Sequence, residues 1–258
     1  MCLILFSYQN HPNFPLILLA NRDEMYSRPT QALHWWDKEP SILAGKDEQD
    51  GGTWLGITET GRFAALTNFR ETGQRCGIKS RGHLTTAFLS GQQTPQQFLR
   101  EVENTHQLYN GFNLLVGDKN GLYYYSNREQ HTRKLEPGFY GLSNHLLNTP
   151  WPKVTDGLEG LRGLTRQEPN PAALLDLLRN NNVADDKRLP NTGVGLSAER
   201  MLSPRFIQSK VYGTRSSSLV LLDRQGKLTF SEKRFGNEGA ELGESEFSFT
   251  LTQSDERF

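Results

Sequence analysis

The sequence predicts an α+β domain in which helices cover the outer faces of large antiparallel sheets. Apolar segments of strand length alternate in blocks with helical segments, in the order strands, two helices, strands, two helices, strands. No internal repeat or coiled-coil heptad is present in the 258 residues. This length supports one large core without disulfides or metal. We therefore expect a single domain over residues 1–258.

The first half of the chain is expected to begin with strands and to continue with two helices. Strands are predicted at 3–8, 15–20, 42–44, 53–58 and 62–68. A short turn separates the last two, which predicts a β-hairpin. Ser80 is a candidate N-cap for a helix over 80–89. Thr94 and Gln97 form a capping box around Pro95, which predicts a second helix from there to residue 107.

The second half repeats this order. Strands are predicted at 112–117, 122–126, 139–143, 216–222 and 227–230, and helices at 152–164 and 171–178. Asn170 is a candidate N-cap for the second of these helices. The acidic segment from about residue 236 is predicted to be a flexible tail.

Charge and cysteine content exclude several classes of function. Lys plus Arg equals Asp plus Glu at 29 each, so no excess positive charge favours nucleic acid as a partner. The longest apolar run near the start, residues 16–20, is far shorter than the roughly 20 residues that span a bilayer, so no integral membrane association is expected. The two cysteines, Cys2 and Cys76, make no disulfide framework. We expect a cytoplasmic protein.

Common nucleotide and metal motifs are absent from the sequence. It contains no GxxxxGK[ST], HExxH or CxxC pattern. The six histidines are scattered, without the spacing that metal ligands show. We therefore predict no metal site.

Cys2 is a candidate nucleophile because of its position. Removal of Met1 would place a thiol and a free α-amine on one residue. The two groups have ordinary pKa values of about 8.5 and about 7.7 to 8.0, so the amine can accept the thiol proton. The alternative is a small buried strand residue with no chemical role.

The charged quartet at 21–24 is predicted to lie beside Cys2. Strands 3–8 and 15–20 would pair antiparallel through the turn at 10–14, which brings Asn21, Arg22 and Asp23 next to the start of the chain. A nearby arginine would lower the thiol pKa, and an aspartate could hold the amine. The alternative is an ordinary charged strand end.

Five motifs together resemble the NRDE family, also called the transport and Golgi organisation protein 2 family. They are Cys2, the NRDE quartet at 21–24, DGGTWLG at 50–56, TNFR at 67–70 and GLSN at 141–144. That family is similar in turn to N-terminal nucleophile (Ntn) hydrolases. The resemblance implies a four-layer αββα sandwich, in which two antiparallel sheets lie between helical layers.

The resemblance also implies roles for individual residues. Cys2 matches the nucleophile and Asp23 the aspartate that holds the α-amine. Asn68 matches an oxyanion-hole donor, Asn144 a second asparagine near the amine, and Arg215 an arginine close to the nucleophile. Both asparagines can alternatively be turn residues at strand ends.

Further residues are predicted to contact the ligand: Asn21, Arg22, Glu24, Trp54 and Arg70. Two features depart from the hydrolase pattern. Arg22 directly precedes Asp23, so strand alternation places the two side chains on opposite faces. A retained Met1 would make the Cys2 nitrogen an amide that cannot act as a base.

The resemblance implies three functions. The first is a carrier that uses the Ntn scaffold to bind and traffic haem, with no cofactor required and haem held reversibly through arginines. The alternative is a Cys2-dependent amidohydrolase for a small non-peptide amide or acyl bond. Members of the family are also linked to acyl-CoA and lipid handling. A role in organising proteins through surface contacts is a weaker expectation, since no recognition segment stands out.

Overall fold

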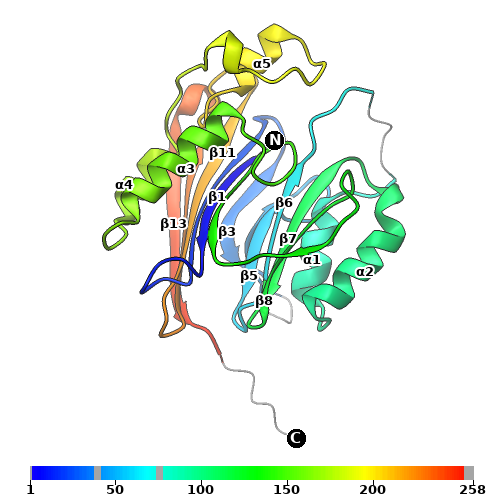
Figure 1. Ribbon diagram of the computed structural model, residues 1–258, viewed down its shortest axis with the longest axis vertical. Helices are drawn as coiled ribbons and strands as arrows, with labels where there is room; N and C mark the ends of the chain where they lie inside the picture. The colour runs from blue at the N-terminus through cyan, green and yellow to red at the C-terminus, as the bar shows by residue number, and fades with distance from the viewer. Residues whose placement is uncertain (1, 38–41, 74–77, 253–258) are drawn as a thin grey trace, which may run out of the picture.

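Two antiparallel sheets pack face to face in the computed structural model, which describes residues 2–37, 42–73 and 78–252 (Figure 1). Six strands form the first sheet: β1 (Cys2–Tyr8), β2 (Leu16–Met25), β10 (Gly138–Leu142), β11 (Tyr212–Leu222), β12 (Lys227–Phe235) and β13 (Glu241–Thr250). Their order is β10-β1-β2-β11-β12-β13. Met1 and Cys76, about which the sequence makes predictions, lie outside the described residues.

The second sheet contains seven strands in sequence order. They are β3 (Thr30–Trp35), β4 (Ile42–Asp47), β5 (Leu55–Thr58), β6 (Phe63–Asn68), β7 (Phe112–Asp118), β8 (Gly121–Ser126) and β9 (Arg133–Lys134). Leu55 pairs with Ala65 and Ile57 with Phe63, which confirms the predicted hairpin. The interior between the sheets is apolar, with Ile4, Phe6 and Leu18 of the first sheet among its fully or nearly fully buried side chains.

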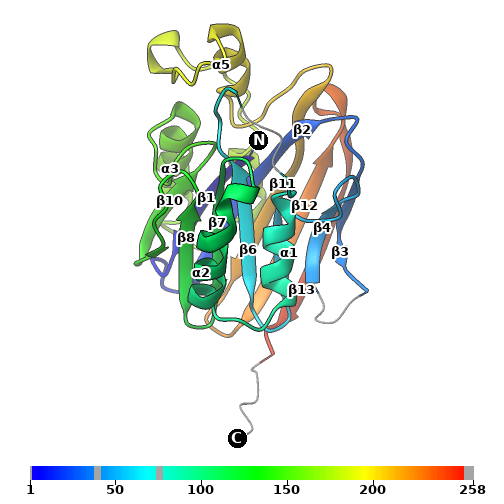
Figure 2. The same ribbon diagram turned by 90° about the vertical axis from the view of Figure 1, so that its right-hand side faces the viewer.

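Helices cover the outer faces of both sheets (Figures 1 and 2). Helices α1 (Gly82–Ser90) and α2 (Pro95–Thr105) pack on the seven-stranded sheet, and α3 (Pro152–Leu164) and α4 (Pro171–Leu177) on the six-stranded sheet. The four layers confirm the predicted αββα sandwich. A short helix, α5 (Leu196–Leu202), lies at one end of the sandwich and was not predicted.

Capping predictions were right for two helices and wrong for one. Thr94 and Gln97 form the capping box of α2, and Asn170 accepts from the Ala173 amide at the start of α4. Ser80 does not cap α1, whose N-cap is Arg81; the Ser80 hydroxyl instead donates to Asp50 at 3.2 Å. The Ser80 side chain therefore binds the Asp50 carboxylate and does not cap the helix.

The predicted flexible tail is in part a strand. Residues Glu241–Thr250 form β13, which pairs along β12 at the edge of the sheet. The alternation in this segment explains the difference, because Phe247 and Phe249 turn toward the core between the sheets while the residues between them face solvent. Phe249 contacts Trp35 edge-on, with ring centroids 5.0 Å apart.

Two glycines bring α3 close to the sheet beneath it. A Cβ atom at Gly157 would lie 2.5 Å from Leu5 Cδ1, and one at Gly141 would lie 2.5 Å from Val154 Cγ1. Side chains at these positions would push the helix outward. The two glycines thereby allow α3 to pack closely against β1 and β10.

A buried ion pair connects the α5 segment to the end of β6. Arg70 Nη1 lies 2.6 Å from Glu199 Oε2, and both side chains are almost completely buried. Glu199 Oε1 accepts from the amide and hydroxyl of Thr192 at 2.9 and 2.6 Å. The guanidinium of Arg70 stacks on Trp151, 4.6 Å from the ring centroid. Arg70 therefore has a structural role in holding α5 against the sandwich.

Phe249→Ala tests whether β13 is docked in solution. The substitution removes a partly buried ring and its contact with Trp35, so we expect the free energy of unfolding to fall by about 2 kcal/mol in a urea titration. Ser248→Ala, on the exposed face of the same strand, should change it by no more than about 0.5 kcal/mol. Equal stability of the two variants would mean that the tail is not packed as described.

Arg70→Met tests the buried ion pair. It leaves the Glu199 carboxylate buried without its counter-charge, which typically costs about 3 to 5 kcal/mol of unfolding free energy. Arg200→Met is the matched control, because Arg200 pairs with Asp186 at the surface, where ion pairs contribute little. Urea unfolding followed by tryptophan fluorescence compares the two; similar midpoints would contradict a stabilising role for the Arg70–Glu199 pair.

Candidate functional site

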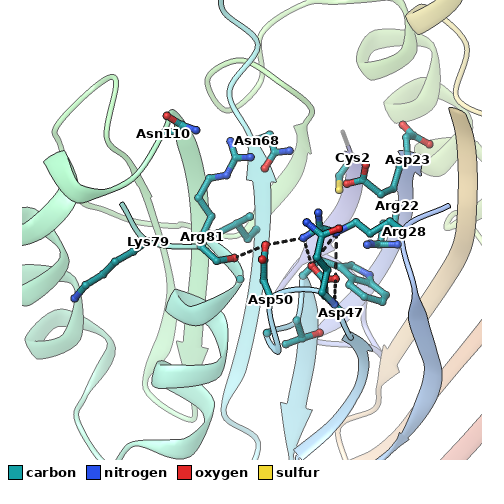
Figure 3. A pocket seen from close by; sticks show the side chains of 18 of the residues that line it. Cys2, Arg22, Asp23, Arg28, Asp47, Asp50, Asn68, Lys79, Arg81 and Asn110 are labelled. Carbon is teal, nitrogen blue, oxygen red and sulfur yellow. Dashed lines mark hydrogen bonds and ion pairs between the residues drawn. The ribbon is translucent and has the colours of Figure 1, made fainter. Parts of the chain in front are cut away.

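A cleft of about 670 Å³ opens at the end of the sandwich where β1 begins and β2 and β6 end. Six residues predicted for the site line it: Cys2, Arg22, Asp23, Glu24, Trp54 and Asn68. Cys2, Arg22 and Asp23 form one wall, and Asn68, Arg81 and Asn110 form the facing wall (Figure 3). The two sheets thus contribute opposite sides of one site.

Strand pairing places the quartet beside Cys2, as the sequence predicts. Cys2 lies opposite Arg22 and Leu3 opposite Asn21 in the β1–β2 ladder. Side chains alternate along a strand, so Cys2 and Arg22 share the face between the sheets. The Asn21 and Asp23 side chains leave β2 on the opposite face, toward the layer of α3 and α4.

The Cys2 thiol is half-buried at the cleft. Burial raises its pKa, and the nearby Asp23 charge raises it further, whereas Arg22 and a hydrogen bond with the Asp23 backbone lower it. The net shift is upward. The thiol is therefore protonated at neutral pH and needs a base to become a nucleophile.

Arg22 forms part of the wall next to Cys2. Its guanidinium carbon lies 4.3 Å from the centroid of the Trp54 ring, and Nη1 donates to Thr30 Oγ1 at 3.2 Å. The side chain is only 6% exposed. This stacking holds a positive charge at the cleft without a carboxylate in direct contact among the described residues.

Asp23 is almost completely buried where β2 meets β11. Its Oδ1 accepts from Thr214 Oγ1 at 2.7 Å, and its backbone carbonyl accepts from Tyr212 Oη at 3.0 Å. Burial raises the pKa of the carboxyl, and the positive charge of Lys153 is the strongest described side-chain influence that opposes this shift. The carboxylate lies one residue beyond the Cys2–Arg22 pair, where it can hold an amine on Cys2.

Asn68 and Asn144 have different positions in the site. Asn68 ends β6 and lines the cleft. Asn144 is fully buried behind it: Nδ2 donates to the Asn68 carbonyl at 2.9 Å, and the Asn144 carbonyl accepts from the Arg70 amide at 2.7 Å. Asn144 therefore positions Asn68, whose own amide faces the cleft.

Besides Asn144, three further residues predicted for the site lie outside the cleft. Asn21 points to the helical layer, where Nδ2 donates to the carbonyls of Leu178 and Arg205 at 3.1 and 2.7 Å. Arg70 is paired with Glu199, as described above. Arg215 donates to the backbone carbonyls of Met25 and Arg28, at 2.9 and 3.0 Å, and so supports the β2–β3 turn. In the structure these three side chains support neighbouring segments, and their predicted contact with a ligand or with the reacting groups stays a prediction.

The sequence did not identify the charged rim of the cleft. Arg28 lies 2.5 Å from Asp47 and 2.6 Å from Asp50, so the two carboxylates neutralise it. Arg81 donates to the Gly111 carbonyl at 3.0 Å, and burial lowers its pKa. Lys79 also lines the rim. Asp50 is part of the DGGTWLG motif, but nothing in the spacing shows its contact with Arg28.

The described residues contain no group of three or more His, Cys, Asp or Glu side chains that could hold a metal ion. No helix in this part of the chain is long and apolar enough to cross a bilayer.

Comparison with known proteins places the chain in a family. Residues 1–237 match the family described as Transport and Golgi organisation 2. The human Transport and Golgi organization protein 2 homolog is 36% identical over 278 residues, which cover 97% of this chain and 99% of that protein. The Drosophila melanogaster Transport and Golgi organization protein 2 is 28% identical over 263 residues, covering 90% and 92%.

A solved structure shares the fold at low sequence identity. It is the Caenorhabditis elegans N-acylethanolamine-hydrolyzing acid amidase ortholog, with a TM-score of 0.53, 12% identity, and coverage of 85% of this chain and 92% of that one. This likeness supports an Ntn-hydrolase type of fold. The chain belongs to the Transport and Golgi organisation 2 family, as its NRDE and associated motifs predict.

Proposed function

We propose that this protein is a cysteine amidohydrolase that cleaves a small, polar amide in the cleft around Cys2. The observation that carries the proposal is that three strand ends place the candidate groups at one cleft: the Cys2 thiol of β1, the Asn68 amide of β6 and, buried on the other face of the strand pair, the Asp23 carboxylate of β2. Nucleophile, amine holder and oxyanion donor are the groups that acyl transfer requires.

The reaction begins with removal of Met1, which converts the Cys2 nitrogen into a free α-amine next to Asp23. The amine takes the thiol proton, and the sulfur attacks the substrate carbonyl carbon. Asn68 donates to the oxygen that becomes negative. The carbon–nitrogen bond then breaks, the leaving nitrogen takes the proton from the amine, and an acyl thioester remains on Cys2. Water, deprotonated by the same amine, releases the acid and restores the thiol.

The lining of the cleft supports a polar substrate. Charged and amide side chains from both sheets dominate it, and the large apolar side chains are Trp54, Leu66 and Ile78. The face of Trp54 is already occupied by Arg22. An acyl-CoA thioester, the other substrate class implied by the family resemblance, would be open to the same attack by Cys2.

Reversible haem binding is the second candidate. The observation that favours it is the size of the cleft together with cationic side chains at Arg22, Lys79 and Arg81, which can pair with propionates. The polar lining counts against it, because haem sites expose broad apolar walls to the porphyrin. No histidine lines the described cleft, so Cys2 is the candidate axial ligand there.

The hydrolase proposal predicts a processed and reactive N-terminus. Intact mass should show that Met1 is absent, and the protein should turn over at least one member of a panel of N-acyl amides, N-acyl amino acids and acyl-CoA thioesters. Cys2→Ala should abolish turnover. Asn68→Ala should lower kcat about 100- to 1000-fold, because an oxyanion donor is lost.

Asn110→Ala is the matched control, since Asn110 lies on the same wall of the cleft without a predicted role. It should retain kcat within a few-fold. Retention of Met1, together with no turnover by protein released from a fusion with Cys2 first, would refute the hydrolase.

Haem titration tests the second candidate separately. If haem occupies the cleft, a shifted Soret band should appear at micromolar protein, and Arg81→Ala should weaken binding several-fold because a propionate contact is removed. Arg162→Ala, on the outer helix α3, should leave the affinity unchanged. A Soret band identical to that of free haem would exclude this function.

A further inference from the structure

Lys153 is a buried lysine that the chemistry proposed above does not use. It is the second residue of α3 and is only 3% exposed. Its Nζ makes no hydrogen bond to the part of the chain that the structure describes. A buried ammonium is costly unless opposite charge compensates it. The charges around Lys153 therefore decide what it does.

Charged groups from four segments lie near enough to the Lys153 amine to influence its pKa. Burial lowers the Lys153 pKa to about 8; Asp23 of β2 is the strongest influence in the opposite direction. Arg70, after β6, lowers the pKa further, while Cys2 of β1 and Glu199 of α5 raise it. Tyr212 and Thr214 of β11 also contact Asp23, through hydrogen bonds to its carbonyl and its carboxylate.

Two cationic side chains, Arg70 and Lys153, influence Asp23, and they differ in their other contacts. Arg70 is held 2.6 Å from Glu199 and stacked on Trp151. Lys153 has no such ion pair among the described residues, and its effect on Asp23 is larger than that of Arg70. Its position is also fixed, because Gly157 and Gly141 allow α3 to approach β1 and β10 closely. Lys153 is thus placed to act on Asp23 and on whatever Asp23 holds.

We propose that Lys153 is a positioning residue for the proposed hydrolase: its ammonium neutralises Asp23 and, by like-charge repulsion, keeps the processed Cys2 α-amine uncharged at neutral pH. This inference rests on the proposed function, which needs that amine as a base. The Cys2 nitrogen lies opposite Arg22, one position from Asp23. Asp23 therefore follows the residue that pairs with Cys2, and it is also the strongest favourable influence on the charge of Lys153.

The carboxylate and the ammonium have opposite effects on the protonation of the Cys2 α-amine. A carboxylate alone would stabilise the protonated amine and raise its pKa, leaving little free base at pH 7. A second cation at the same carboxylate opposes protonation of the amine, because the two positive charges repel each other. Lys153 keeps its own proton in this scheme. The proton that moves during catalysis passes between the Cys2 sulfur and the Cys2 nitrogen.

The test measures the Cys2 amine directly and does not require turnover. Protein with Cys2 as its first residue is released from an N-terminal fusion, and the α-amine is acetylated by trace acetic anhydride across a pH series, followed by mass spectrometry. Lys153→Met should raise the pH midpoint of amine reactivity by about one unit, because the repelling charge is lost. Alkylation of the thiol by iodoacetamide at pH 7 should slow in parallel.

Lys153→Arg restores the charge and should return the midpoint to that of the wild type. Lys227→Met, at the exposed first residue of β12, controls for the change in net charge and should have no effect. An unchanged midpoint in a folded Lys153→Met variant would overturn the proposal. It would leave the hydrolase itself standing if the same preparation turns over an amide.

A second measurement covers the case in which Lys153→Met does not fold. In wild-type protein, NMR titration of the lysine side chains should show Lys153 losing its proton near pH 8, well below the ordinary value of about 10.4. Asp23→Asn should lower this midpoint further, because the favourable carboxylate is removed. A Lys153 midpoint that does not respond to Asp23→Asn would show that the two groups are not coupled and would overturn the proposal.

Discussion

The antiparallel pairing of β1 with β2, with Cys2 opposite Arg22, is the constraint on which the candidate site depends. Both faces of these strands are buried: Ile4 and Phe6 enter the core between the sheets, while Leu3 and Leu5 enter the core under α3 and α4. A slip of one residue would exchange these two sets, so burial on both sides specifies the register strongly. The same register turns Arg22 toward the cleft and Asn21 toward the helices. A single strand end thereby supplies one residue to the site and another to its support.

The positive charges of the arginines that line the cleft are compensated to different degrees. Arg28 is neutralised by two carboxylates, whereas Arg22 relies on the Trp54 ring and one hydroxyl. Partial burial makes each of these groups sensitive to its neighbours, because the local dielectric is lower than that of water. For the Cys2 thiol the result is a raised pKa despite an adjacent arginine. A protonated thiol in a pocket of fixed charges is chemically useful only if a base lies within reach, which is why the state of the N-terminus decides between a hydrolase and a binding protein.

Features that depend on local pattern could be predicted from the sequence, and features that depend on distant contacts could not. Turn residues and strand alternation were enough for the β5–β6 hairpin, the α2 capping box and the approach of the quartet to Cys2. Asn21, Arg22 and Glu24 are predicted together as ligand contacts, however, whereas alternation assigns Asn21 to the opposite face from Arg22. Nothing in the sequence around Lys153 indicates that it is buried. Its burial arises from the packing of α3, which lies about 130 residues downstream of Asp23. β13 was not predicted, because the acidic residues of this segment outweigh the short alternation of Phe247 and Phe249.

The support behind Asn68 links the cleft to the α5 end of the molecule. The Asn144 side chain holds the Asn68 carbonyl, the Arg70 amide binds the Asn144 carbonyl, and the Arg70 guanidinium holds Glu199 of α5. These contacts are buried, so loss of any one leaves polar groups unpaired in a low-dielectric interior. The placement of Asn68, the proposed oxyanion donor, and the docking of α5 are therefore parts of one polar network. The same network supplies two of the charges that influence the pKa of Lys153, so the α5 segment also contributes to the electrostatic environment of that lysine.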